Sequence, residues 1–394
     1  MSIVKEKIRQ AIEILKEKNI DLWLIFVRES HTLTDPSLPL ILDASCTWQS
    51  AFLISATGKT VAIVGNLDSA AIKDIGAYDH VISYKTSIRE ELIREITAMN
   101  PANIALNFSR NDHMSDGLTH GMFLLLNDYL SQTPFIERIV SAQEIVSAVR
   151  SRKSPAELER LKNAADMTVS IFDELSKNLK VGMTEKQIAE LILEQVKNLG
   201  AGLAWDAATC PSVFTGPDTA GAHFGPTDRQ TGPCHIMNID FGVRIDDYVS
   251  DLQRSWYFLK DGEATASDRV QHAFNTVRDA ISRAAEFLRP GVEGWKVDAV
   301  ARQYIVSQGY DEYPHALGHQ VGREAHDGSG VLCPKWERYG DLPYFKVEAG
   351  QVYTLEPRVT CAGHGVATIE EEVVVTENGC EFLSPRQMEL YLVR

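Results

Sequence analysis

Two segments in the second half of the chain each predict a β-hairpin that carries a pair of opposed carboxylates. In the first, strand-like runs on both sides of the polar stretch 244–247 predict a turn centred on Ile245 and Asp246. Residues whose numbers sum to 491 are then partners, so Asp240 and Asp251 are expected to face each other with Cβ atoms roughly 5 Å apart. Like charges at that distance repel, and a cation between them resolves the repulsion.

A second hairpin is predicted around the glycine-containing loop 361–365. A turn centred on Gly363 makes partners of residues whose numbers sum to 726, which brings Glu356 opposite Glu370. One such hairpin is more often an ordinary pair of strands with solvent-facing acids, because carboxylates are common on surfaces. Two of them in one chain, together with a cluster of histidines, favour an oxygen-rich metal site.

Three histidines, His315, His319 and His326, lie within twelve residues between the two hairpins. The segment lacks the glutamate of the helical zinc-protease motif, because alanine follows His315. Gly318 and Gly322 favour an irregular or extended segment over a helix. A single histidine is usually structural, whereas three beside two acidic hairpins indicate a functional site.

Composition restricts the partners and the location of the protein. The chain has 394 residues, of which 44% are hydrophobic and 24% charged, which is typical of a globular protein. Its net charge of -15 argues against nucleic acid or an anionic membrane as a partner. The six cysteines form no C-x-x-C pair and are expected to be reduced thiols. The N-terminus lacks a signal-peptide core and no run reaches the ~18 apolar residues of a membrane span, so a cytoplasmic location is expected.

The chain is expected to form two domains, 1–150 and 151–394. The first part alternates helical and strand patterns, which predicts a small α/β domain without a catalytic constellation. The boundary is marked by a helix start in which Ser154 is the N-cap, Pro155 the first helical residue and Glu157 the partner in a capping box. Helices then alternate with the hairpins to the end of the chain, so the second domain is predicted to be α+β.

Residues 155–380 resemble the metallopeptidases of the methionine aminopeptidase, prolidase and aminopeptidase P superfamily. The resemblance rests on an Asp pair eleven residues apart within Asp-x-Gly…Tyr-x-Ser-Asp-x-x-Arg, followed by His-x-x-Gly-His, Glu-Pro and Ile-Glu-Glu. The preceding α/β domain is similar to that of the prolidase, aminopeptidase P and creatinase branch. This resemblance implies an α+β protein with a C-terminal pita-bread domain, and a homodimer.

The resemblance also assigns roles to individual residues. Five positions match the metal ligands of the family: Asp240, Asp251, His319, Glu356 and Glu370. Glu356 also matches the carboxylate that transfers a proton. Three further positions match histidines that line the substrate site: His223, on a loop rich in glycine and proline, His315 and His326.

Four carboxylates and one imidazole form a hard ligand set that suits two divalent ions, Mn²⁺ first, with Co²⁺, Zn²⁺ and Fe²⁺ as alternatives. Two such ions would lower the pKa of a bound water toward neutrality, and the hydroxide so formed would attack the substrate carbonyl. Glu356 is expected to accept the proton and pass it to the leaving nitrogen. His315 or His326 is expected to donate to the developing oxyanion.

The function predicted from these residues is hydrolysis of the peptide bond before proline, by an Xaa-Pro dipeptidase or aminopeptidase. Two alternatives remain at this point: a creatinase-like hydrolase of a small non-peptide C–N bond, and a catalytically inactive peptide-binding module. Three residues depart from the family pattern: Asp247 in place of glycine, Gln253 in place of threonine and Thr368 in place of arginine. The last change removes a cation near the ligands, which is expected to affect metal affinity or substrate choice.

Overall fold

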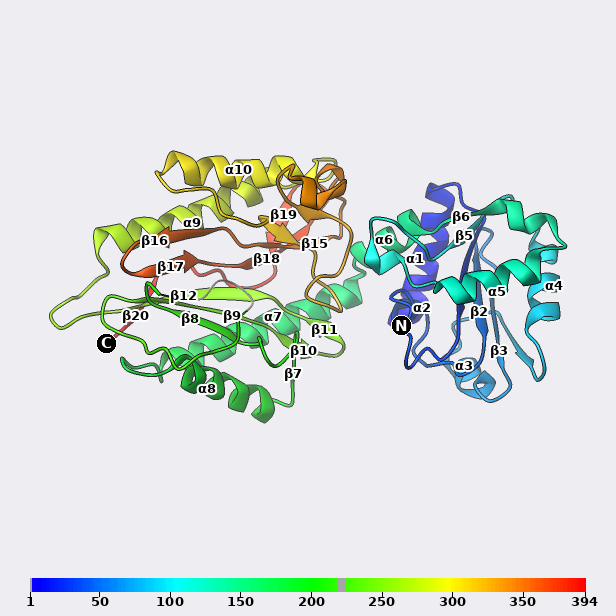
Figure 1. The fold of residues 1–394 in the computed structure, drawn as a ribbon, viewed down its shortest axis with the longest axis horizontal. Helices are drawn as coiled ribbons and strands as arrows, with labels where there is room; N and C mark the ends of the chain where they lie inside the picture. Colours follow the sequence, from blue (N-terminus) through cyan, green and yellow to red (C-terminus); the bar gives the residue numbers. More distant parts are fainter. Residues whose placement is uncertain (1, 219–223) are drawn as a thin grey trace. The chain divides into compact units, whose positions relative to one another are not determined.

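The computed structural model describes residues 2–218 and 224–394 and divides the chain into two compact units, Met1–Arg150 and Ser151–Arg394 (Figure 1). The predicted site residue His223 lies outside the described residues. Within the described ranges, no helix has both the length and the apolar character needed to cross a membrane.

The first unit is built on a mixed sheet with helices on both faces. Its strands are β1 Leu22–Val27, β2 Ser50–Ser55, β3 Thr60–Gly65, β4 His80–Tyr84, β5 Ile104–Leu106 and β6 Ile139–Ser141, in the spatial order β4-β3-β2-β1-β5-β6. Its helices are α1 Ile3–Glu17, α2 Leu38–Ile41, α3 Ser69–Ile75, α4 Arg89–Met99, α5 His120–Leu130 and α6 Gln143–Ser151. The strand β1 is apolar throughout because one set of its side chains packs with α1 and α6, and the alternate set packs with α4 and α5.

Four long helices cover the second unit: α7 Pro155–Ser176, α8 Glu185–Asn198, α9 Asp268–Phe287 and α10 Gly294–Ser307. The capping box predicted at the start of α7 is present, since Ser154 and Glu157 satisfy each other's backbone N–H groups. Thr184 and Gln187 form a second capping box at the start of α8. These caps fix where the two helices begin and therefore which of their faces meet the strands.

The strands of the second unit form several small sheets. They are β7 Gly202–Leu203, β8 Ser212–Thr215, β9 Ile236–Phe241, β10 Val243–Ile245, β11 Tyr248–Val249, β12 Leu252–Phe258, β13 Gly318–His319, β14 Val331–Leu332, β15 Val352–Leu355, β16 Arg358–Cys361, β17 Gly365–Thr368, β18 Glu371–Val375, β19 Cys380–Phe382 and β20 Tyr391–Val393. One sheet has the order β20-β12-β9-β8, another the order β15-β18-β19, and β16 pairs with β17.

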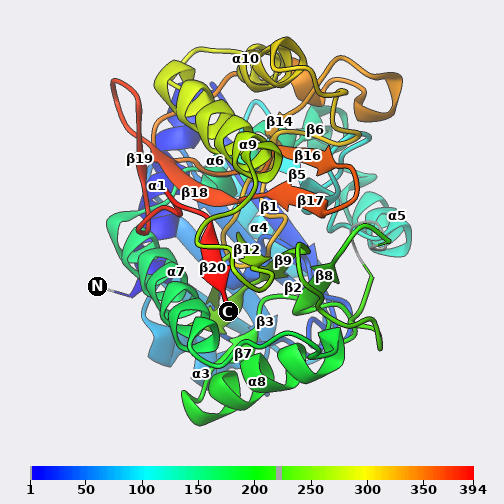
Figure 2. The ribbon, with the colours of Figure 1, turned by 90° about the vertical axis from the view of Figure 1, so that its left-hand side faces the viewer.

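Helices lie on the two outer sides of these strands. Figures 1 and 2 place α7 and α8 beyond β8, β9 and β12, and α9 and α10 beyond β15 to β18. On β9, Met237, Ile239 and Phe241 join the core that contains α7 and α8, so Asn238 and Asp240 point the other way. We call the strand sides turned away from the helices the inner face.

The same alternation holds in the second half of this unit. Val359, Cys361, Ala367 and Ile369 belong to the core formed with α9 and α10. Successive residues of a strand point to opposite sides, so the even-numbered residues of β16 and β17 lie on the inner face. Burial of the odd-numbered set against the helices thus determines which side chains can meet in the interior of the second unit.

Candidate metal centre

The second acidic hairpin has the predicted register. The pairs β15–β18 and β16–β17 both join residues whose numbers sum to 726. Glu356 and Glu370 lie between these two ladders, where the direct pairing of the strands is interrupted. The N–H of Glu356 donates instead to the Leu317 carbonyl oxygen over 2.8 Å. Both glutamates are on the inner face because they continue its even-numbered set.

The predicted register of the first hairpin is wrong by two residues. Asp240 is the direct partner of Gln253 rather than of Asp251, and all pairs sum to 493. The reason is a tight turn at Asp246 and Asp247, whose φ angles are +48° and +64°, as a two-residue hairpin turn requires. A shift of two residues preserves the face. Asp240 and Asp251 are therefore diagonal neighbours on the same face, close enough for each carboxyl group to shift the pKa of the other.

The two hairpins are joined to each other at Gln253 and Glu370. The N–H of Glu370 donates to the Gln253 carbonyl oxygen over 3.1 Å, and the reverse bond measures 3.4 Å. The side-chain amide of Gln253 also donates to Glu370 Oε2 over 2.8 Å. The hydroxyl of Thr368 donates to Gln253 Oε1 over 3.2 Å, which fixes the orientation of that amide. Two of the three departures from the family pattern thus contact each other and hold the Glu370 carboxylate in place.

The histidine segment is extended, as its glycines predict. The strand β13 pairs with β14, and the N–H of His319 donates to Thr354 Oγ1 over 3.1 Å. A Cβ atom on Gly318 would lie 1.8 Å from the carbonyl oxygen of Thr354 on β15, so a larger residue would push β13 away from β15. This close approach brings the imidazole of His319 over the inner face.

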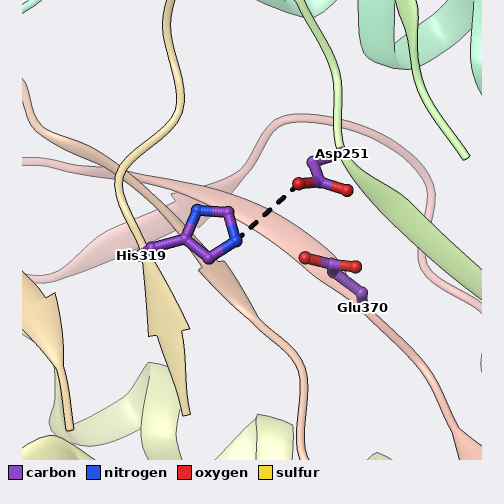
Figure 3. A group of neighbouring side chains, drawn as sticks. All are labelled: Asp251, His319 and Glu370. Atoms are coloured by element: carbon purple, nitrogen blue, oxygen red, sulfur yellow. Dashed lines mark ion pairs between the residues drawn. The ribbon is translucent and has the colours of Figure 1, made fainter. Parts of the chain in front are cut away.

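The imidazole of His319 is surrounded by carboxylates. Its Nε2 atom lies 3.7 Å from Asp251 Oδ2 and 3.4 Å from Glu356 Oε1. One ligand atom each from Asp251, His319 and Glu370 lies within 4.8 Å of the others, and Figure 3 shows these three side chains converging. With Asp240 against Asp251, the structure brings all five predicted ligand side chains together.

The two other predicted site histidines that the structure describes, His326 and His315, differ in burial. The ring of His326 is exposed and meets the ring of His319 edge to face, with 4.1 Å between centroids. His315 is partly buried, and its Nδ1 atom lies 2.8 Å from the Ala316 carbonyl oxygen. Since a carbonyl only accepts, Nδ1 carries the proton in this contact.

Burial and mutual repulsion raise the pKa values of the four carboxyl groups. Burial raises the pKa of Asp240 to about 7. Burial first, and then the charge of Asp240, raises the pKa of both Asp251 and Glu356 well above the usual range. The pKa of Glu370 is raised by burial and by the charge of Asp251. Without a cation the acids therefore hold their protons to a higher pH than exposed carboxyl groups do.

The donor set fits divalent cations. Among the described residues, the buried Oδ1 atom of Asp240 has no hydrogen-bond partner, so it is available to a ligand. Four carboxylates that repel one another in a buried place are stabilised by positive charge between them, and oxygen with one imidazole nitrogen suits hard or borderline ions. A divalent cation would displace the retained protons.

Glu372 is a site neighbour that the sequence reading missed. It lies on the inner face two residues after Glu370, and its Oε1 atom accepts the N–H of Asp251 over 2.8 Å. Burial raises its pKa to about 8. The even-numbered spacing from Glu370 was a signal for this position, because alternate residues of a strand share a face.

We expect the metal-free protein to lose stability as the pH rises through 7 to 8. Asp240 and Glu372 have folded-state pKa values of about 7 and 8, above the unfolded values of roughly 4. A raised pKa contributes stability that is complete below the unfolded value and is lost as pH rises through the folded value. Thermal melts at pH 5.5, 7 and 8.5 in chelator and in excess Mn²⁺ measure this.

The difference in melting temperature between the chelated and the Mn²⁺-loaded protein should increase as the pH rises. Glu372→Gln keeps an acceptor for the Asp251 N–H but cannot ionise, so it serves as the control and should flatten the profile of the chelated protein. A chelated wild type whose melting temperature follows that of the Mn²⁺-loaded protein across the three pH values would contradict the expectation.

Comparison with known proteins identifies relatives over both units. The sequence profile of metallopeptidase family M24 matches residues 159–377. An uncharacterized peptidase of Staphylococcus haemolyticus is 27% identical over 337 residues, which cover 85% of this chain and 87% of the relative.

Solved structures share the fold along nearly the whole chain. An Xaa-Pro dipeptidase from Bacillus anthracis superposes with a TM-score of 0.75 at 22% identity, covering 99% of this chain and 100% of the other. An X-Pro aminopeptidase from Thermotoga maritima gives a TM-score of 0.72 at 24% identity, covering 98% and 99%. The predicted α+β architecture with a pita-bread domain is confirmed.

Proposed function

The chain belongs to metallopeptidase family M24, and we propose that within this family it cleaves the peptide bond before proline, using two divalent metal ions. The observation that carries the proposal is the convergence of four carboxylates and one imidazole on the inner face of the second unit. Membership of the family makes the chain a metallopeptidase, which argues against the inactive peptide-binding alternative.

Five residues would hold the ions: Asp240, Asp251, His319, Glu356 and Glu370. Bound divalent ions polarise a carbonyl oxygen and activate water at neutral pH. The hard donor set favours Mn²⁺ or Co²⁺. The bond from Gln253 to Glu370, measuring 2.8 Å, holds one of these carboxylates in a fixed orientation before an ion arrives.

Glu356 is the residue best placed to move a proton. It is partly exposed, unlike Glu370, and the hydroxyl of Thr354 donates to its Oε1 atom over a long 3.5 Å. It takes a proton from the attacking water and passes it to the nitrogen that leaves.

The histidines bind and polarise the substrate. His326, exposed beside His319, donates an N–H to the carbonyl oxygen as negative charge develops there. His315, whose Nδ1 atom lies 2.8 Å from the Ala316 carbonyl oxygen, lines the substrate site with His326. His223 is proposed to line the same substrate site.

Selectivity for proline is supported by the two solved neighbours, both named for Xaa-Pro substrates, which cover both units of this chain. Hydrolysis should therefore be measured with Mn²⁺-loaded protein on Ala-Pro, Ala-Pro-Ala, Ala-Ala and creatine. We expect turnover of at least one proline peptide at a kcat/KM well above that for Ala-Ala.

The same panel distinguishes the small-amide alternative. Turnover of creatine without turnover of either proline peptide would replace the proposal by a creatinase-like hydrolase. Equal rates for Ala-Pro and Ala-Ala would remove the proline preference while leaving a peptidase. Asp166→Ala, a change at a partly exposed acid on α7 that pairs with Lys162, is the control for preparation and metal loading.

A further inference from the structure

Arg358 stands on the inner face of the second unit, beside the acids. It is the direct partner of Thr368 in the β16–β17 ladder, so the two side chains project from the same side. Thr368 uses that side to reach Gln253, which in turn binds Glu370. The guanidinium of Arg358 therefore belongs to the face that carries the candidate ligands.

The alternate residues of these strands confirm this direction. Val359, Cys361 and Ala367 are buried in the core formed with α9. Since neighbouring residues of a strand point to opposite sides, Arg358 cannot share that core. It also lies two residues from Glu356, a separation of about 6.6 Å along an extended strand.

The guanidinium N–H groups of Arg358 have no hydrogen-bond acceptor among the residues that the structure describes. The guanidinium is only partly exposed, and none of its N–H groups makes a hydrogen bond or an ion pair with a residue that the structure describes. A partly buried charge with five donors and no partner is unfavourable, and a bound anion would relieve it.

The substrate of a peptidase supplies such an anion. The C-terminal carboxyl carbon of a dipeptide lies one residue, about 3.8 Å, beyond the scissile carbonyl carbon, which is within the reach of an arginine that stands two residues from Glu356. The planar fork of guanidinium N–H groups matches the two oxygens of a carboxylate.

We propose that Arg358 binds the C-terminal carboxylate of the substrate and makes this enzyme a dipeptidase. The proposal rests on the peptidase function proposed above and specifies its substrate class. A peptide extended beyond the second residue has an amide where the dipeptide has its carboxylate. It therefore loses the ionic contact, and the enzyme discriminates against it.

The test compares each dipeptide with its C-terminal amide. Kinetics of the Mn²⁺-loaded protein are measured on Ala-Pro, Ala-Pro amide, Ala-Leu and Ala-Leu amide, for wild type, Arg358→Met and Arg358→Lys. Arg283→Met, the same chemical change at an exposed position of α9, is the matched control. Metal content and melting temperature of every variant establish that the fold and the ions are retained.

We expect wild type to prefer the acid over the amide by roughly 10- to 100-fold, the scale of one charged hydrogen-bonded contact. Arg358→Met should remove this preference through KM and leave the amide kinetics unchanged, while Arg358→Lys should retain part of it. Arg283→Met should keep the preference intact.

Equal turnover of acid and amide by wild type would overturn the carboxylate site and leave the peptidase function standing. An acid preference that persists in a folded, metal-loaded Arg358→Met protein would also overturn it. A preference for Ala-Leu over its amide without turnover of Ala-Pro would refute the proline selectivity. Loss of that same preference in Arg358→Met would still support the carboxylate site. Absence of hydrolysis of all four compounds would overturn both proposals.

Discussion

Chelation of divalent ions is expected to abolish peptide hydrolysis, and Mn²⁺ or Co²⁺ is expected to restore it. The four carboxylates around His319 repel one another without a cation, and the activated water of the reaction depends on the ions. Asp251→Ala should lose at least one ion, because Asp251 offers an oxygen within 4.8 Å of ligand atoms of His319 and Glu370. Metal analysis by mass spectrometry alongside hydrolysis rates measures both effects.

Asp166→Ala, which removes a carboxylate on α7 outside the cluster, should keep its metal and its activity. Full hydrolysis by protein proven free of metal would refute the dinuclear mechanism outright. Retention of both ions by Asp251→Ala would remove that residue from the ligand set while leaving metal dependence itself untouched.

Glu356→Gln is expected to lower kcat by roughly 100-fold or more, the scale of a lost general acid and base. The substitution keeps the size of the side chain and one oxygen atom, but the amide cannot accept a proton as a carboxylate does. Weakened metal binding would also slow the reaction, so kcat is to be compared at measured, saturating occupancy of the ions.

His326→Ala tests the other half of the mechanism. The ring of His326 packs against that of His319 without being a ligand in this scheme, so the variant should keep its ions and turn over more slowly. His319→Ala is the matched comparison and should lose metal. The opposite result, with metal lost only from His326→Ala, would reverse the two assignments. Unchanged turnover by both Glu356→Gln and His326→Ala at full occupancy would refute the mechanism.

The sequence predicted the register of the second hairpin correctly and that of the first hairpin wrongly. The turn at Gly363 was correctly placed, so the register of Glu356 and Glu370 followed from counting. The turn of the first hairpin was misplaced, because adjacent aspartates adopt the left-handed conformation more readily than the pattern of flanking residues indicated. Because the shift was an even number of residues, Asp240 and Asp251 still lie on the same face of the sheet.

Contacts between distant segments could not be read from the sequence. No periodicity indicates that Gln253 meets Glu370, or that Thr368 orients that amide, since both contacts depend on how the two hairpins dock. The loss of arginine at position 368 suggested a missing cation. The structure places Arg358 directly across the strand pair from it, a relation that the register reveals and composition does not.

The backbone bridge between Gln253 and Glu370 has a consequence for how the protein matures. Asp240 and Asp251 come from one hairpin, while His319, Glu356 and Glu370 come from later in the chain, so neither half holds a complete ligand set. A divalent ion bound by both halves stabilises only the assembled state, because binding energy becomes folding energy when no preformed site exists beforehand. On the proposed ligand set, metal binding would therefore favour correctly docked chains, because a chain whose halves dock out of register would offer the ion fewer ligands.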